Sequence, residues 1–110
     1  MKSTTVHQYI TLEVAGSDVE DYRKTREIEA AIVNAFGERA AYQVFRLSTV
    51  ERIEEELLEP EPILAASGGK LPVILVNITL FSEDVDAHKF AALESKFALR
   101  LVAKDVFDEP

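Results

Sequence analysis

Ser67-Gly68-Gly69-Lys70 is the stretch closest to a catalytic motif, because glycines followed by a lysine are typical of phosphate-binding loops. Such a loop also needs four residues between its glycines, a Ser or Thr after the lysine, and a helix directly behind it. Here Leu71 and Pro72 follow, and an apolar segment typical of a strand comes next. The stretch is therefore interpreted as a connecting loop.

The titratable residues form no catalytic constellation in the sequence. Glu83, Asp84 and Asp86 could share a magnesium or calcium ion, but acidic residues just before a helix are also expected from capping and from the helix dipole. Neither of the two histidines, His7 and His88, is paired by local sequence with a serine nucleophile or a patterned aspartate. Both histidines are expected to be exposed, and no catalytic, metal-binding or cofactor-binding residue is assigned.

The absence of cysteine from all 110 residues excludes several chemistries at once. Disulfides, thiolate metal sites, iron–sulfur clusters and thiol catalysis all need that residue. The net charge of −8 disfavours nucleic acids and anionic membranes, and the twelve Lys and Arg residues are spread along the chain rather than clustered. The sequence has neither a signal peptide nor an apolar run of about 18 residues, so a cytoplasmic location is expected.

The acidic run ERIEEELLEPEP, residues 51–62, is the feature most typical of an interaction surface. It holds six glutamates against one arginine, Arg52. Like charges four residues apart, such as Glu51 and Glu55, slightly destabilise a helix, and a basic partner would relieve that repulsion. The alternative is a solvated helix face without a partner.

Hydrophobic periodicity divides the chain into strands and helices. Alternation over residues 9–14 predicts a half-buried strand, and Ser17 with Glu20 gives the capping-box spacing of a helix that ends at Gly37. The next segments predict a strand at 42–47, a helix that begins at Ser48 and a helical turn at 63–66. Residues 72–81 predict either one strand or a hairpin that turns at Asn77. A last helix is predicted from residue 84 or 86, and residues 105–110 are predicted to be a frayed end. This pattern predicts one layered α/β domain over residues 1–110, with parallel strand pairs and the order β-α-β-α-β(-β)-α.

This element order, with Pro72 at the start of the third strand, resembles that of a thioredoxin-like domain, where a proline in a usually cis bond occupies that position. ILAASGGKLPVILVN, residues 63–77, is similar to a region of ArsD-type metallochaperones, and YITLEVAGSD, residues 9–18, resembles the opening strand of KaiB-type proteins. The resemblance spans about residues 7–102 and implies a thioredoxin-like fold. Thioredoxins and ArsD-type proteins carry cysteines in the loop after the first strand. This chain has AGSDV at residues 15–19 instead, so thiol exchange and arsenic capture are excluded.

The expected function is protein binding without catalysis or a cofactor, as an adaptor, a regulator or a small subunit of an assembly. The expected partner is another protein with a basic face, and homo-oligomerisation stays open. The alternative is a small enzyme, or a ligand or metal carrier, that uses carboxylates, histidine or loop amides. The expected contact residues are Gly16, Ser17, Asp18, Tyr22, Glu54, Glu55, Gly68, Gly69, Leu71 and Pro72.

Overall fold

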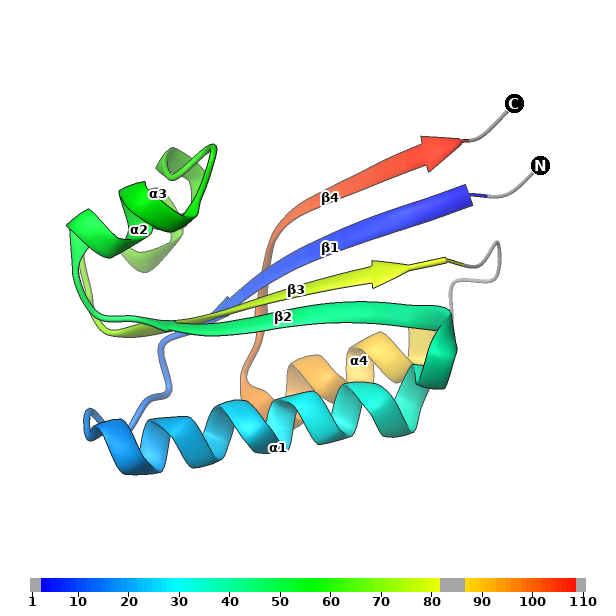
Figure 1. Ribbon diagram of the computed structural model, residues 1–110, viewed down its shortest axis with the longest axis horizontal. Helices are drawn as coiled ribbons and strands as arrows, with labels where there is room; N and C mark the ends of the chain where they lie inside the picture. The colour runs from blue at the N-terminus through cyan, green and yellow to red at the C-terminus, as the bar shows by residue number, and fades with distance from the viewer. Residues whose placement is uncertain (1–2, 82–86, 109–110) are drawn as a thin grey trace.

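The computed structural model describes residues 3–81 and 87–108 of the chain (Figure 1). The mixed α/β class is confirmed. The elements in chain order are β1 (Ser3–Thr11), α1 (Asp18–Phe36), the short 3-10 helix η1 (Gly37–Arg39), β2 (Ala40–Leu47), α2 (Val50–Glu56), α3 (Glu61–Ser67), β3 (Val73–Leu80), α4 (Ala87–Phe97) and β4 (Arg100–Asp108).

The four strands form one sheet in the order β2-β3-β1-β4, and every neighbouring pair is antiparallel. Strands β1 and β2 run in the same direction with β3 between them, and β3 and β4 do so with β1 between them. This is the β-α-β-β-α-β topology of ferredoxin-like folds, with α2 and α3 inserted between β2 and β3. The prediction of parallel neighbouring pairs is therefore wrong, because periodicity identifies the buried side of a strand and not its neighbour in the sheet.

The predicted secondary structure of the C-terminal residues is also wrong. Helix α4 ends at Phe97, and residues predicted as helix and frayed end form β4 along β1. The reversal occurs at Ala98, which has a φ of 52°, while the Leu99 N–H donates to the Glu94 carbonyl at 2.9 Å. An alanine rarely adopts this left-handed geometry, so the sequence carries no breaker signal there. The predicted start of this helix at residue 84 or 86 lies outside the described residues.

Two hydrophobic clusters pack on the two sides of the sheet. Helices α1 and α4 cover one side, whereas α2 and α3 cover only one end of the other (Figure 1). Side chains of β3 alternate between them, with Ile74 and Val76 in the α1–α4 cluster and Val73 and Leu75 in the α2–α3 cluster. Burial on both sides explains the continuous apolar run of this strand. Residues 73–80 form one strand without a turn at Asn77.

Helix starts follow capping chemistry closely. Ser17 is the N-cap of α1, and its Oγ accepts a hydrogen bond from the Glu20 N–H at 3.3 Å, as predicted. The cap of α2 is Thr49 rather than Ser48, because Thr49 Oγ1 accepts from the Arg52 N–H at 3.1 Å. The turn predicted at residues 63–66 is part of α3. None of the helices in the described ranges is long and apolar enough to cross a membrane.

His7 lies in the core, so its predicted exposure is wrong, whereas His88 is exposed as predicted. Strand β1 begins at Ser3, earlier than the predicted residue 9, which places His7 inside the strand. Its ring stacks on Phe90 of α4 with centroids 4.0 Å apart. Burial, reinforced by the nearby positive charge of Lys104, lowers the pKa of His7 below its ordinary value, while Glu94 opposes this weakly.

His7 makes the stability of the fold dependent on pH. Because the pKa is lower in the folded state, the unfolded chain binds the proton first as the pH falls below about 6.5. We expect the free energy of unfolding to fall as the pH is lowered from about 7.5 to 5, measured by urea denaturation. The variant His7→Phe should lose most of this dependence. An unchanged dependence in His7→Phe would assign it to other groups.

Candidate functional site

The two loops predicted as contact surfaces lie at the same end of the sheet. Thr11 pairs with Ile74 and Leu47 pairs with Val73, so β1 and β2 end where β3 begins. The loop at Gly16–Asp18 and the loop at Gly68–Pro72 therefore share this end. The Leu71–Pro72 peptide bond is cis, as the resemblance implied.

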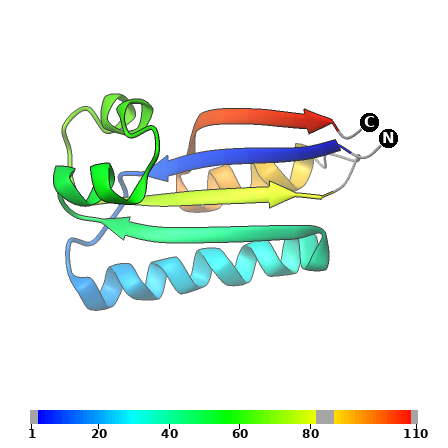
Figure 2. The same cartoon turned by 45° about the horizontal axis from the view of Figure 1, so that its top comes forward.

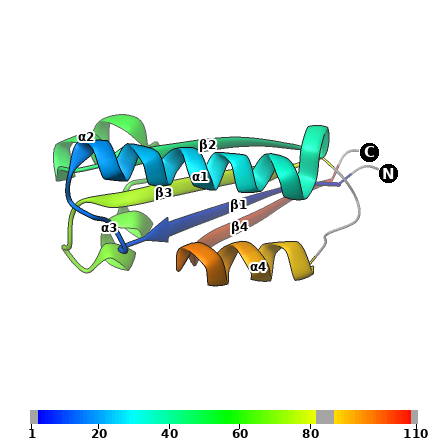
Figure 3. The same ribbon diagram turned by 90° about the horizontal axis from the view of Figure 1, so that it is seen from below.

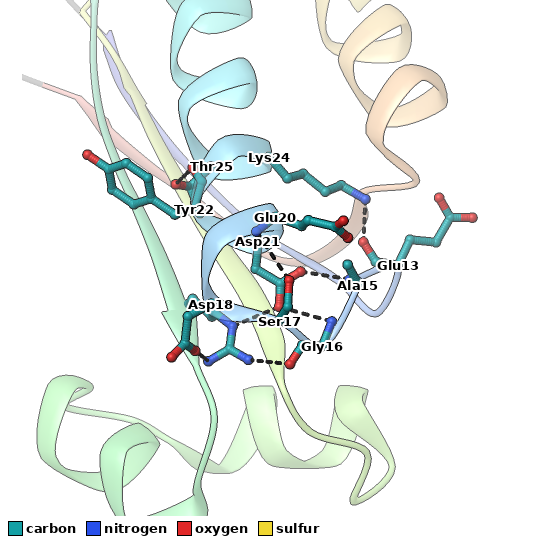
Figure 4. Close-up of polar contacts among 11 residues, drawn as sticks. Glu13, Ala15, Gly16, Ser17, Asp18, Glu20, Asp21, Tyr22, Lys24 and Thr25 are labelled. Atoms are coloured by element: carbon teal, nitrogen blue, oxygen red, sulfur yellow. Dashed lines mark hydrogen bonds and ion pairs between the residues drawn. The ribbon is translucent and has the colours of Figure 1, made fainter.

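The Gly16–Asp18 loop is held by a buried ion pair rather than left open. The Asp21 carboxylate accepts hydrogen bonds from the N–H of Ala15 at 2.7 Å and of Gly16 at 3.2 Å. The same carboxylate accepts from Nε of Arg46 on β2 at 2.8 Å (Figure 4 shows these contacts). A second nitrogen of Arg46 lies 3.0 Å from Asp18, whose side chain is 92% exposed.

The charge of Asp21 is stabilised by these donors. Burial raises the pKa of the Asp21 carboxyl, but the hydrogen bond from Arg46 and the two backbone N–H groups outweigh it, so the pKa lies below its ordinary value. Asp21 is therefore ionised at neutral pH and acts as the acceptor that joins the loop, α1 and β2. This arrangement serves to position the loop.

The other predicted contact residues lie on separate surfaces. Tyr22 is exposed on α1, and its hydroxyl accepts a hydrogen bond from Arg26 at 3.0 Å. Glu54 and Glu55 are exposed on α2. In the second loop, Gly68 and Gly69 are exposed with positive φ, and Leu71 and Pro72 are half-buried. The structure thus brings the two loops to one end of the sheet and places Glu54 and Glu55 on the inserted helices.

A concave surface that the sequence did not reveal lies beside α2 and α3, on the sheet side opposite α1. Gln8 pairs with Asn77, and Val6 pairs with both Thr79 and Asp105. Directly paired residues share one side of a sheet. Val6 and Gln8 lie on the same side of β1 as Ile10, which belongs to the α2–α3 cluster, because every second residue of a strand faces the same way. These residues therefore form an open sheet surface beyond the two helices, where Figure 2 shows the strands without a covering helix.

Residues 56–62, from the last residue of α2 to the start of α3, are called the α2–α3 connection. We call the hollow where the open sheet surface meets this connection the acidic corner. It has a volume of about 250 Å³. Three of its lining residues, Glu56, Glu59 and Asp105, carry carboxylates, and Leu58 is fully exposed. The complete lining is Val6, Gln8, Glu56, Leu57, Leu58, Glu59, Pro62 and Asp105. Carboxylates around apolar carbon suit a cationic group carried on an apolar stem.

Only one feature of the sequence could have indicated the residues of the acidic corner. Leu57 and Leu58 are adjacent within the acidic run, and a short helix on a sheet cannot bury both. Leu57 packs against the α2–α3 cluster and Leu58 points outward. Asp105 was hidden because its segment was expected to be frayed, and Val6 because β1 was expected to begin later.

The carboxylates considered for a cation, Glu83, Asp84 and Asp86, lie outside the described residues. Among residues 3–81 and 87–108, no group of three His, Asp or Glu side chains is close enough to hold a metal ion.

No protein-family model matches the chain, and the searches of curated proteins and of solved structures find no significant match either. The thioredoxin-like relationship therefore stays a prediction.

Proposed function

We propose that this chain is a protein-binding domain, an adaptor, regulator or small subunit, that recognises a basic segment of another protein through the acidic corner. The observation that carries the proposal is the combination at one hollow of three carboxylates and a fully exposed leucine, Leu58. Without cysteine, thiol redox activity is no part of this function.

Charge supports a basic partner. Six glutamates lie between residues 51 and 61, and the single cation among them, Arg52, lies 3.3 Å from Glu56. The net negative charge of the whole chain attracts a cationic segment at long range. Contacts with Glu56, Glu59 and Asp105 would then hold it in the hollow.

The apolar part of the acidic corner supports a protein segment rather than a small cation. Leu58 projects fully into solvent beside half-buried Leu57 and Val6. Burying a leucine side chain contributes about 1.5–3 kcal/mol, which gives a partner with its own apolar side chain a gain that an inorganic ion lacks. We therefore infer a partner that alternates lysine or arginine with apolar residues.

The two loops at the end of the sheet remain a second proposed contact surface. The thioredoxin-like relationship, which led to their selection, also remains a proposal. Gly16, Ser17 and Asp18 present a loop of fixed shape, because Asp21 and Arg46 hold its backbone. The acidic corner does not depend on the thioredoxin-like kinship.

Binding of synthetic peptides tests the proposal. We expect an amphipathic peptide of leucine and lysine to bind with one site in calorimetry at about 0.15 M salt, since buried pairs resist screening better than exposed ones. A peptide with the same leucines and with glutamate in place of lysine is the control and should not bind. Equal binding of the two peptides, or binding of neither, would contradict the proposal.

A further inference from the structure

A groove between α1 and α4 lies on the side of the sheet opposite the acidic corner. Figure 3 shows the two helices running side by side across this side of the molecule. The groove has a volume of about 310 Å³. Its lining is Ala31, Asn34 and Ala35 from α1, with Lys89, Ala92, Leu93 and Lys96 from α4.

The chemistry of this groove is complementary to that of the α2–α3 connection. Small side chains, Ala31, Ala35 and Ala92, leave room for an inserted apolar group, and both charged residues of the lining are lysines. On the connection, the fully exposed Leu58 lies between Glu56 and Glu59 in the sequence. A leucine with two neighbouring carboxylates is complementary in polarity and charge to a groove lined by small apolar side chains and two lysines.

We infer that the α1–α4 groove binds the α2–α3 connection of a second copy of this chain. Leu58 of one copy would enter the groove of the next, with Glu56 and Glu59 near its lysines. This inference rests on the proposed function and makes it more specific. The lysine-lined groove of a second copy would be one of the basic partners that contact the carboxylates of the acidic corner.

The placement of the two surfaces determines the kind of assembly. The α2–α3 connection lies on one side of the sheet, and helices α1 and α4, which line the groove, lie on the other (Figure 1). A contact between two different surfaces is heterologous, so each added copy leaves one free groove and one free connection. The result is a series of head-to-tail oligomers whose mean size rises with concentration. The net charge of −8 opposes this assembly and keeps it reversible.

Sedimentation velocity of two variants, separately and mixed, tests the inference. In Leu58→Ser the connection is disabled, and in Lys96→Glu the groove is disabled; both positions are exposed, so folding should be retained. We expect the wild-type chain to associate between about 10 µM and 1 mM, and each variant alone to weaken association at least tenfold. An equimolar mixture should form a dimer and nothing larger, since only one productive contact can form. Val106→Ser, exposed on β4 and outside both surfaces, is the control and should associate like the wild type.

Three results would overturn the inference: a wild-type chain that stays monomeric, variants that associate unchanged, or a mixture that stays monomeric. The peptide measurement separates this failure from failure of the proposed function. If the lysine peptide binds while the chain stays monomeric, the self-association is wrong and the acidic corner is retained. If the peptide does not bind, the proposed function itself is contradicted.

Discussion

Replacing Asp21 by alanine is expected to lower the free energy of unfolding by about 3–5 kcal/mol, because removing one partner of a buried ion pair leaves the other uncompensated. Arg46, whose side chain is only 21% exposed, would lose its shortest contact, and the N–H groups of Ala15 and Gly16 would lose their acceptor. Urea denaturation at neutral pH measures the change as a shift of the midpoint at constant slope.

Asp18→Ala is the matched control for that experiment. Asp18 contacts the same arginine at 3.0 Å, but its side chain is almost fully exposed, and exposed pairs contribute about 0–1 kcal/mol. We expect a large loss for Asp21 and a small one for Asp18. Similar losses in both variants would mean that burial of Asp21 is not what makes the pair important.

Reversing two charges in the acidic corner, Glu56→Lys with Glu59→Lys, is expected to weaken binding of the leucine–lysine peptide by about 100-fold, since losing close charge pairs costs about 2–5 kcal/mol. Both residues line the hollow and are exposed, so the fold should tolerate the change. Calorimetry under the conditions used for the wild type measures the difference.

Glu54→Lys with Glu55→Lys changes the net charge equally and serves as the control. Both residues are exposed on α2, but neither lines the acidic corner. This variant should weaken the peptide by less than about tenfold, through long-range charge alone. Equal losses in the two double variants would indicate diffuse attraction to the acidic helices and no specific hollow.

Local features of the fold could be predicted because neighbouring residues determine them. Ser17 caps α1 by a hydrogen bond three residues along the chain, and Gly37 follows the last helical residue with a φ of 58°. The strand predicted at residues 42–47 lies within β2, Ala40–Leu47. Such features need no knowledge of which segments meet in space.

Strand pairing could not be predicted because it depends on contacts between distant segments. Hydrophobic periodicity does not indicate that β3 lies between β1 and β2, an arrangement that leaves all neighbouring pairs antiparallel. Strand β4 was missed because Ala98 reverses the chain where a glycine would have signalled the end of α4. The missed strand β4 also helps to form the acidic corner, which combines β1, β4 and the α2–α3 connection.

His7 shows the same limit for a single residue. His7 was expected to be exposed because it lies before residue 9, the predicted start of the first strand, whereas the pairing of β1 with both β3 and β4 places it beneath Phe90. The Nδ1 atom of His7 and the Oγ1 atom of Thr5 are buried without a hydrogen-bond partner among the described residues. The side of β1 beneath α4 is therefore more polar than the apolar pattern of the sequence indicates.

The most direct test of the acidic corner is an NMR titration of the isotopically labelled chain with the leucine–lysine peptide. We predict that the largest amide shift changes occur at Val6, Gln8, Leu58 and Asp105, with smaller changes at Gly16 and Gly68. Largest changes in either of those two loops, with the acidic corner unaffected, would contradict the account and move the binding surface to the end of the sheet.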